Sequence, residues 1–128
     1  MAKVTGIGGV FFKARDPKAL EAWYAKQLGI DVSSWGGAAF DWKGPDNPEG
    51  AGTTAWSIFP VDAKKFGPSS APFMINYRVT DLHGILAALR SAGAQVEDKV
   101  DESEYGKFGW AMDPEGNKIE LWEPPAGQ

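Results

Sequence analysis

The sequence predicts an α+β protein in which two βαβββ modules pair into a half-open mixed β-sheet barrel that forms a cleft and carries its helices outside. Three observations support this prediction. The order of strand, helix and about three strands occurs twice in 128 residues, the two copies agree in letters as well as in pattern, and a tight-turn signal at 113–116 (DPEG) joins the last two strands.

The first module is expected at about residues 5–60. Residues 6–14 (GIGGVFFKA) alternate as a strand does. Asp16 then offers an N-cap and Pro17 a first helical position, and apolar residues recur at helical spacing until Gly29. Trp23 of this helix is expected in the core between helix and sheet. Two strands rich in β-forming residues are expected to follow, at 37–42 and 53–59.

The second module is expected at about residues 72–125, after a linker with Gly, Pro and Ser at its centre, 67–70. Residues 73–79 (FMINYRV) predict a strand, and a helix begins after Asp81 and ends at Gly93. Further strands are expected at 96–100, 105–112 and 117–122. The two modules together make a single domain over 1–128.

The two copies can be aligned residue by residue. Segment 9–16 lies over 74–81, and alignment of the last strands on Pro60 and Pro124 sets Trp56 against Glu120. In each module the helix covers one face of the sheet, so the other face needs cover from elsewhere. Side-chain alternation places these residues on that second face: Gly9, Phe11, Lys13, Met74, Asn76, Arg78 and Glu120. A cleft lined by both modules follows, and a cleft is the usual place for a small molecule.

Composition excludes several classes of function. A formal charge of −4 with intermixed acids and bases provides no basic patch for nucleic acid. No run of about 18 apolar residues or signal-like start occurs, so a cytoplasmic protein without a membrane partner is expected. The absence of cysteine rules out disulfides and thiolate metal sites.

The segment 113–121 (DPEGNKIEL), the aromatic-rich helix that ends in Leu28-Gly29 and the paired modules resemble the vicinal oxygen chelate superfamily, which includes glyoxalase, extradiol dioxygenases and bleomycin-resistance proteins. The resemblance covers nearly the whole chain. It implies paired βαβββ modules and often a homodimer. In the enzymes it also implies a divalent metal held by His, Gln or Glu at four equivalent positions on cleft-facing strands.

In this sequence the four positions fall on Gly9, Trp56, Met74 and Glu120. Only Glu120 is competent for a hard cation, since glycine has no side chain, an indole offers no lone pair and a thioether prefers soft metals. A catalytic divalent site of this kind needs three or more protein ligands, so no metal cofactor is expected. The single histidine, His83, is expected to be a solvated or capping side chain.

Glu120 has two interpretations. It is either a structural carboxylate paired with Lys118, Arg78 or Lys13, or the polar anchor of a ligand site and a candidate general base. Arg78 is suited to clamp a ligand carboxylate, and Tyr105 to gate the cleft. The residues expected to bind ligand are Phe11, Trp56, Met74, Asn76, Arg78, Tyr105, Trp110, Glu120 and Trp122.

Three functions remain open on the sequence. The first is a protein similar to bleomycin-resistance proteins, which binds a small organic molecule, cationic or aromatic, in the cleft without the family metal. The alternative is a glyoxalase- or epimerase-type lyase or isomerase with Glu120 as general base and a non-standard metal site. The third is an interaction module whose cleft is a vestige.

Overall fold

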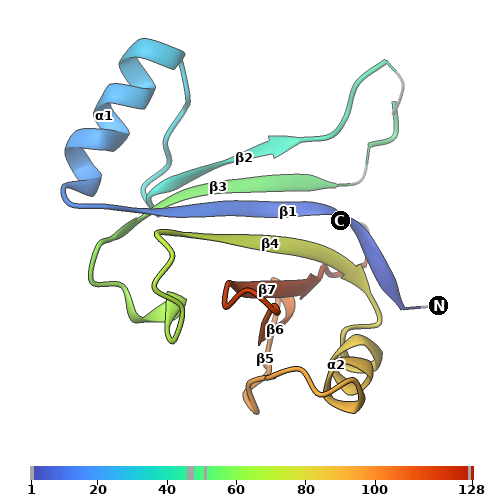
Figure 1. The fold of residues 1–128 in the computed structure, drawn as a ribbon. Helices are drawn as coiled ribbons and strands as arrows, with labels where there is room; N and C mark the ends of the chain where they lie inside the picture. Colours follow the sequence, from blue (N-terminus) through green and yellow to red (C-terminus); the bar gives the residue numbers. More distant parts are fainter. Residues whose placement is uncertain (1, 46–47, 51, 127) are drawn as a thin grey trace.

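The structure is a computed structural model that describes residues 2–45, 48–50, 52–126 and 128. Ten elements follow one another along these ranges (Figure 1). They are β1 (Lys3–Ala14), α1 (Pro17–Leu28), β2 (Gly37–Asp41), β3 (Thr53–Pro60), the short 3-10 helix η1 (Lys64–Phe66), β4 (Phe73–Thr80), α2 (Leu82–Ser91), β5 (Asp101–Ser103), β6 (Gly106–Met112) and β7 (Lys118–Glu123).

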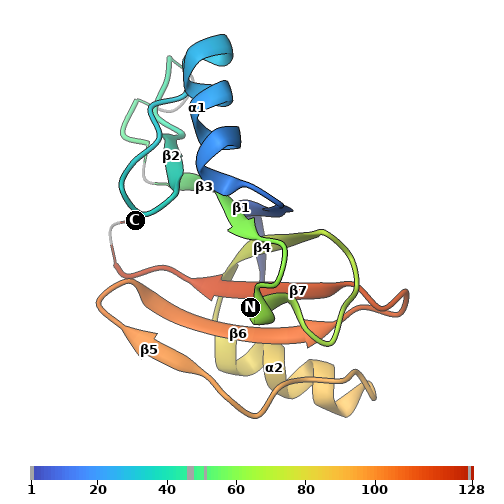
Figure 2. The same cartoon turned by 90° about the vertical axis from the view of Figure 1, so that its left-hand side faces the viewer.

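The strands form one mixed seven-stranded sheet in the order β2-β3-β1-β4-β7-β6-β5. The first strands of the two modules, β1 and β4, pair antiparallel at the centre, and the last strands, β3 and β7, run parallel to them outside. The sheet curls between β4 and β7 into a half-open barrel with two helices (Figures 1 and 2). The predicted fold class is confirmed.

The strands after the helix match the expected segments in the first module and differ in one place in the second. β2 and β3 correspond to the two strands expected at 37–42 and 53–59, and residues 29–36 form no third strand. The expected strand at 96–100 is reduced to one bridge between Val96 and Ala111. Asp31, Ser33 and Ser34 in the first stretch favour turns, which explains why no strand forms there.

The local signals at the helix ends were interpreted correctly. Asp16 Oδ1 accepts a hydrogen bond from Ala19 N at 3.1 Å, Pro17 occupies the first helical position, and Gly29 ends α1 with a φ of 69°. A positive φ is costly for most residues and easy for glycine, so the helix stops there. Asp81 caps α2 in the same way, through Gly84 N at 3.1 Å.

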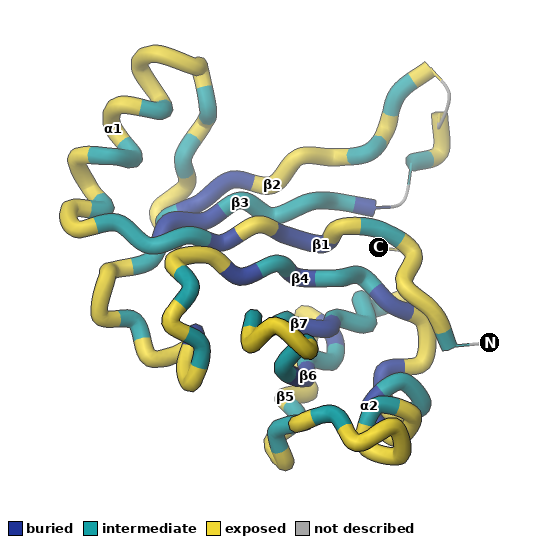
Figure 3. Tube along the Cα trace, viewed as in Figure 1, coloured by how far each residue is buried: buried dark blue, intermediate teal, exposed yellow. Residues whose placement is uncertain are grey.

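The two helices differ in how well they are buried. Leu82 and Leu86 of α2 are buried in a cluster with Val79 and Leu121 on the outer face of the second module. By contrast α1 has no buried residue and stands away from the sheet (Figure 3). Trp23, expected in the core, is 51% exposed, because α1 reaches the sheet through other residues, such as Tyr24.

The inner side of the barrel carries the second cluster of buried residues. Phe11, Met74 and Trp110 point inward from β1, β4 and β6, and Phe66 of η1 is fully buried among them. We call this inner side the concave face, and residues 61–72, which cross it, the strap (Figure 2). The strap therefore covers the concave face as well as joining the two modules.

Candidate functional site

Sheet register brings three polar or aromatic side chains of the concave face together. Asn76 of β4 lies opposite Glu120 of β7, and Trp110 of β6 lies opposite the same Glu120 from the other side. Opposed residues in neighbouring strands point to the same face with their Cβ atoms about 5 Å apart. The three side chains therefore meet.

Glu120 is the centre of this group. Its carboxylate is 1% exposed and accepts hydrogen bonds from Asn76 Nδ2 at 2.6 Å on Oε1 and from Trp110 Nε1 at 2.8 Å on Oε2. Lys65 Nζ lies 3.2 Å from Oε2. Both oxygens are thus held, and the buried charge has a counter-charge, as the energetics of burial demand.

The counter-charge comes from an unexpected place. The sequence suggested Lys118, Arg78 or Lys13 as the partner of Glu120, and that choice was wrong, because the ion pair forms with Lys65 of the strap. The strap has no periodic pattern, so nothing in its residues indicated that it lies over the sheet.

The strap is fastened by a second buried charge. Lys118 Nζ donates to the main-chain oxygens of Lys65 at 2.6 Å and Gly67 at 3.0 Å, and it pairs with Glu97 Oε1 at 2.7 Å. Lys118 is itself buried. Its ammonium group therefore joins the strap to β7, and the Phe66 ring fills the space between the strap and the sheet.

A depression of about 540 Å³ opens beside the Glu120 group. Its walls come from β5, β6 and the strap, and include Phe108, Trp110 and Lys65. Two of the three side chains that hold Glu120 thus line the depression. Asp101 and Glu102 lie on its rim, so the local charge opposes anions.

Arg78 lies two residues beyond Asn76 on the same strand. Its guanidinium sits between the rings of Trp42 and Trp122, 5.3 and 5.8 Å from their centroids, and Nη2 donates to the main-chain oxygen of Gln128. Burial lowers the pKa of Arg78, because desolvation penalises the charged form. Within the described residues, Arg78 Nη1 and Asn76 Oδ1 are buried without a hydrogen-bond partner.

A family model described as a glyoxalase-like domain matches residues 9–122, which is most of the chain and includes the whole Glu120 group. The chain belongs to this glyoxalase-like family. Membership of the vicinal oxygen chelate superfamily, suggested by the segment 113–121, is confirmed with it.

Solved structures agree with this family on the fold. A methylmalonyl-CoA epimerase from Mycobacterium tuberculosis superposes with a TM-score of 0.62 at 21% identity, over 95% of this chain and 89% of that one. A single-site variant of the Streptomyces coelicolor enzyme of the same name, in complex with 2-nitronate-propionyl-CoA, gives 0.71 at 16%, over 98% and 99%. A glyoxalase/bleomycin resistance protein/dioxygenase superfamily member from Vibrio splendidus 12B01 gives 0.56 at 11%, over 96% and 99%. No curated protein matches the sequence.

Trp56 does not lie on the concave face of the glyoxalase-like domain, and the alignment that set it against Glu120 was wrong by one residue. Its ring packs on the α1 side of the sheet, 5.6 Å from the Phe12 ring and 5.0 Å from the Tyr24 ring. Ser57 faces inward instead. It pairs with Phe11 in the β1–β3 register, just as Glu120 pairs with Asn76, the counterpart of Phe11, in the β4–β7 register. A slip of one residue turns a strand's side chains to the opposite face.

The four superfamily positions do not fit a divalent metal. With the corrected register they hold Gly9, Ser57, Met74 and Glu120, and the Ser57 hydroxyl donates to Gly36 O at 3.4 Å. Two N–H donors and an ammonium group already occupy the Glu120 oxygens. Among the residues that the structure describes, no three His, Asp or Glu side chains converge. This donor set therefore does not suit a divalent metal ion.

The remaining predicted site residues are spread over the domain. Phe11 and Met74 belong to the buried cluster under the strap, and Trp122 stacks on Phe108 with centroids 6.1 Å apart. Tyr105 is 69% exposed in the β5–β6 turn, where its main-chain oxygen accepts from Trp122 Nε1 at 2.8 Å. His83 is exposed and lies 3.0 Å from Glu102.

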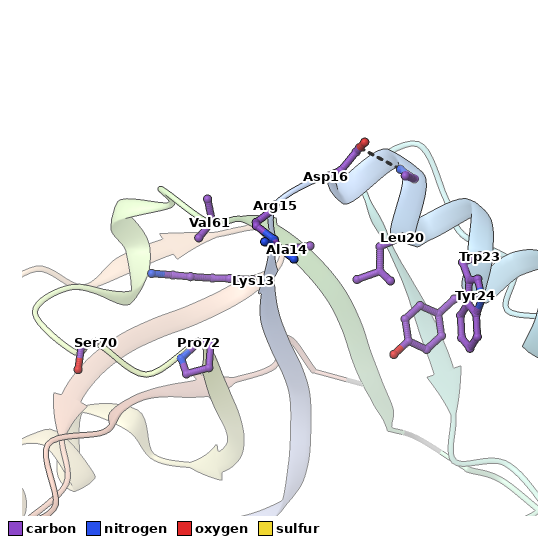
Figure 4. A pocket seen from close by; sticks show the side chains of 11 residues that line it. Lys13, Ala14, Arg15, Asp16, Leu20, Trp23, Tyr24, Val61, Ser70 and Pro72 are labelled. Carbon is purple, nitrogen blue, oxygen red and sulfur yellow. Dashed lines mark hydrogen bonds between the residues drawn. The ribbon is translucent and has the colours of Figure 1, made fainter.

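A larger depression, of about 970 Å³, lies outside the concave face between α1, the end of β1 and the strap (Figure 4). Trp23, Leu20 and Tyr24 form one wall, and Lys13 and Arg15 stand at the end of β1. Sequence reasoning missed it, because it depends on how far α1 stands from the sheet. Among the described residues neither helix is long and apolar enough to span a bilayer.

Proposed function

We propose that this glyoxalase-like domain binds a small organic molecule on its concave face, beside Glu120, without the superfamily metal. The observation that carries the proposal is the Glu120 carboxylate, held by Trp110 and Asn76 and neutralised by a lysine. A fixed, buried carboxylate beside aromatic walls is a preorganised anchor for one polar group of a ligand.

The surroundings favour a flat molecule that is cationic or neutral. Phe108 and Trp110 offer aromatic surface in the 540 Å³ depression, a volume typical of small-molecule sites. The acidic rim at Asp101 and Glu102 and the net charge of −4 both disfavour an anion.

An epimerase or lyase reaction is less well supported. A general base must present a free oxygen to the proton that it removes. Both oxygens of Glu120 are engaged by donors, and the side chain is 1% exposed. Asn76 Nδ2 and Trp110 Nε1 keep one donor on each oxygen even where a ligand replaces Lys65, so the geometry favours binding over proton transfer.

A titration with a matched pair of probes tests the proposal. Benzamidine is a flat aromatic cation and benzamide is its neutral counterpart, and we expect both to quench tryptophan fluorescence, benzamidine at lower concentration. Trp110→Phe removes the indole donor and should lower the affinity for benzamidine about tenfold, or about 1.4 kcal/mol. Trp35→Phe, at an exposed position (56%) outside the concave face, should leave the affinity for benzamidine unchanged.

Chelator and metal provide the second arm of this test. Binding should be the same with EDTA and with added Mn²⁺ or Zn²⁺. A stoichiometric divalent ion retained through purification, or a benzamidine affinity that depends on one, would contradict the metal-free mode. A wild-type protein that responds to neither probe would contradict the binding function.

We further propose that the protein acts as a homodimer. Its accessible surface is 7941 Å², whereas a compact monomer of its mass exposes about 6,600 Å², an excess of about 1,300 Å². A stable dimer buries about 800 Å² on each partner. Much of the exposed apolar surface belongs to the first module and its flanks, at Val10, Trp23, Leu28, Trp35, Phe40, Val61 and Phe73. A second copy of the chain is the occupant that this area fits.

Light scattering after gel filtration checks the homodimer. The wild-type protein should have twice its chain mass of 13.8 kDa, and Trp23→Glu should shift it to the monomer, because a charge would be buried in the interface. Tyr105→Glu changes a still more exposed aromatic residue in the other module and should leave the dimer intact. A monomeric wild type at micromolar concentration would refute the interface.

A further inference from the structure

The ammonium group of Lys65 occupies a cage built by other parts of the chain. Glu120 Oε2 lies 3.2 Å from Nζ on one side, and the ring centroids of Phe11 and Phe59 lie 5.6 and 5.7 Å away on others. An anion combined with aromatic faces within about 6 Å is the arrangement by which proteins recognise ammonium ligands. Lys65 is thus a tethered stand-in for such a ligand.

The cage persists without Lys65, because its walls are fixed by separate contacts. Glu120 is held by Asn76 and Trp110, as described above. Phe11 belongs to the buried cluster, and Phe59 packs on both Phe11 and Phe66, at 5.6 and 5.2 Å between centroids. A carboxylate and two rings held in place bind a cation with little reorganisation.

The Lys65 side chain can leave this cage without moving the strap. Its side chain is 41% exposed, whereas the strap is anchored by Phe66 and by main-chain oxygens that accept from Lys118. Ordering this long, partly exposed side chain costs conformational entropy, which lowers the net free energy of its pair with the buried Glu120. A ligand cation therefore competes with a tethered side chain that carries this entropic cost.

We propose that the Glu120–Phe11–Phe59 cage binds the ammonium group of a small organic amine, which replaces Lys65 Nζ, with the body of the amine extending into the depression lined by Phe108 and Trp110. This inference rests on the proposed function and names its ligand class as a primary alkyl- or arylalkylamine. In the absence of the amine, Lys65 fills the cage and prevents an unpaired buried carboxylate.

Rescue of a truncated lysine tests the cage directly. Lys65→Ala removes the three carbon atoms and the nitrogen that make up propylammonium, and leaves the main-chain oxygen that binds Lys118. We expect millimolar propylammonium to raise the Tm of Lys65→Ala by several degrees and to shift the Trp110 indole N–H resonance. 1-Propanol should produce neither effect. Wild type and Lys64→Ala both keep Lys65, so both should respond only at higher propylammonium concentrations, because Lys65 competes for the cage.

The carboxylate is checked by the double variant Lys65→Ala/Glu120→Gln, which should lose the response to propylammonium. If Lys65→Ala does not fold, Lys65→Met keeps the side-chain length, and benzamidine should bind this variant at least tenfold more tightly than wild type.

The outcomes separate the two proposals. A folded Lys65→Ala that ignores propylammonium, or a Lys65→Met with wild-type benzamidine affinity, would overturn the cage. Benzamidine and benzamide binding to the wild-type protein would still support the function in that case. Rescue of Lys65→Ala without any probe binding to wild type would support the cage alone.

Discussion

Replacing Phe66 by alanine is expected to lower the free energy of unfolding by about 3–5 kcal/mol, the largest effect of any single truncation in the strap. Phe66 is fully buried between Phe11, Met74 and Trp110, which belong to three different strands. Its removal loses the transfer free energy of the ring and leaves a cavity that the curled sheet cannot close. Both terms act in the same direction.

Urea unfolding followed by circular dichroism measures this change. The midpoint should fall with little change in slope, since the surface exposed on unfolding is nearly the same. Tyr105→Ala removes an aromatic ring that is largely exposed, and should cost about 0.5 kcal/mol or less. Equal losses for the two variants would show that the strap is not part of the core.

The strap also marks the limit of what the sequence predicted. Caps at Asp16 and Asp81, the turn at 113–116 and the inward direction of Glu120 all follow from local chemistry or from period-two alternation. The position of residues 61–72 depends on tertiary contacts, those of the Phe66 side chain and those of the main-chain oxygens of Lys65 and Gly67 with Lys118. No local pattern encodes such contacts, so the segment looked like a simple linker.

Two other misjudgements have equally definite causes. Trp56 was placed inward by an alignment of Pro60 with Pro124, but Pro60 is the last residue of β3, paired with Ala14, whereas Pro124 lies one residue beyond the end of β7. An error of one residue is enough to reverse a face. Trp23 has the spacing of a core residue, but α1 leaves it half exposed. A helical apolar stripe shows that a surface needs cover, and does not show whether the cover comes from the same chain.

The sequence also did not predict the shape of the depression beside Trp110. Asn76 and Trp110 were expected to bind ligand, and the structure joins both to Glu120. Lys65 on one side and β5 on the other limit access to this group from solvent. β5 begins at Asp101, after residues 96–100, where a strand was expected and only one bridge forms. Side-chain alternation predicts which residues share a face, whereas the openings of that face depend on loops.

Lys118→Met is expected to cost about 2–4 kcal/mol and to loosen the strap specifically. Methionine keeps most of the apolar stem, so the loss is assigned to the ammonium group. That group satisfies the main-chain oxygens of Lys65 and Gly67 and the carboxylate of Glu97. Because Glu97 is partly exposed, water recovers some of its interaction, and the estimate stays below that for a fully buried pair.

Amide hydrogen exchange distinguishes a loosened strap from a general loss of stability. The amides of Gly67 and Ser69, which donate to Lys64 O and Phe66 O, should exchange faster in Lys118→Met than global unfolding explains. Lys107→Met breaks a partly exposed pair with Glu123 at 3.7 Å and should cost about 0.5 kcal/mol without altering these amides. If Lys118→Met behaves like Lys107→Met, the strap is held by Phe66 alone. If its strap amides are exposed while the rest of the sheet is protected, the buried lysine is what keeps the concave face covered.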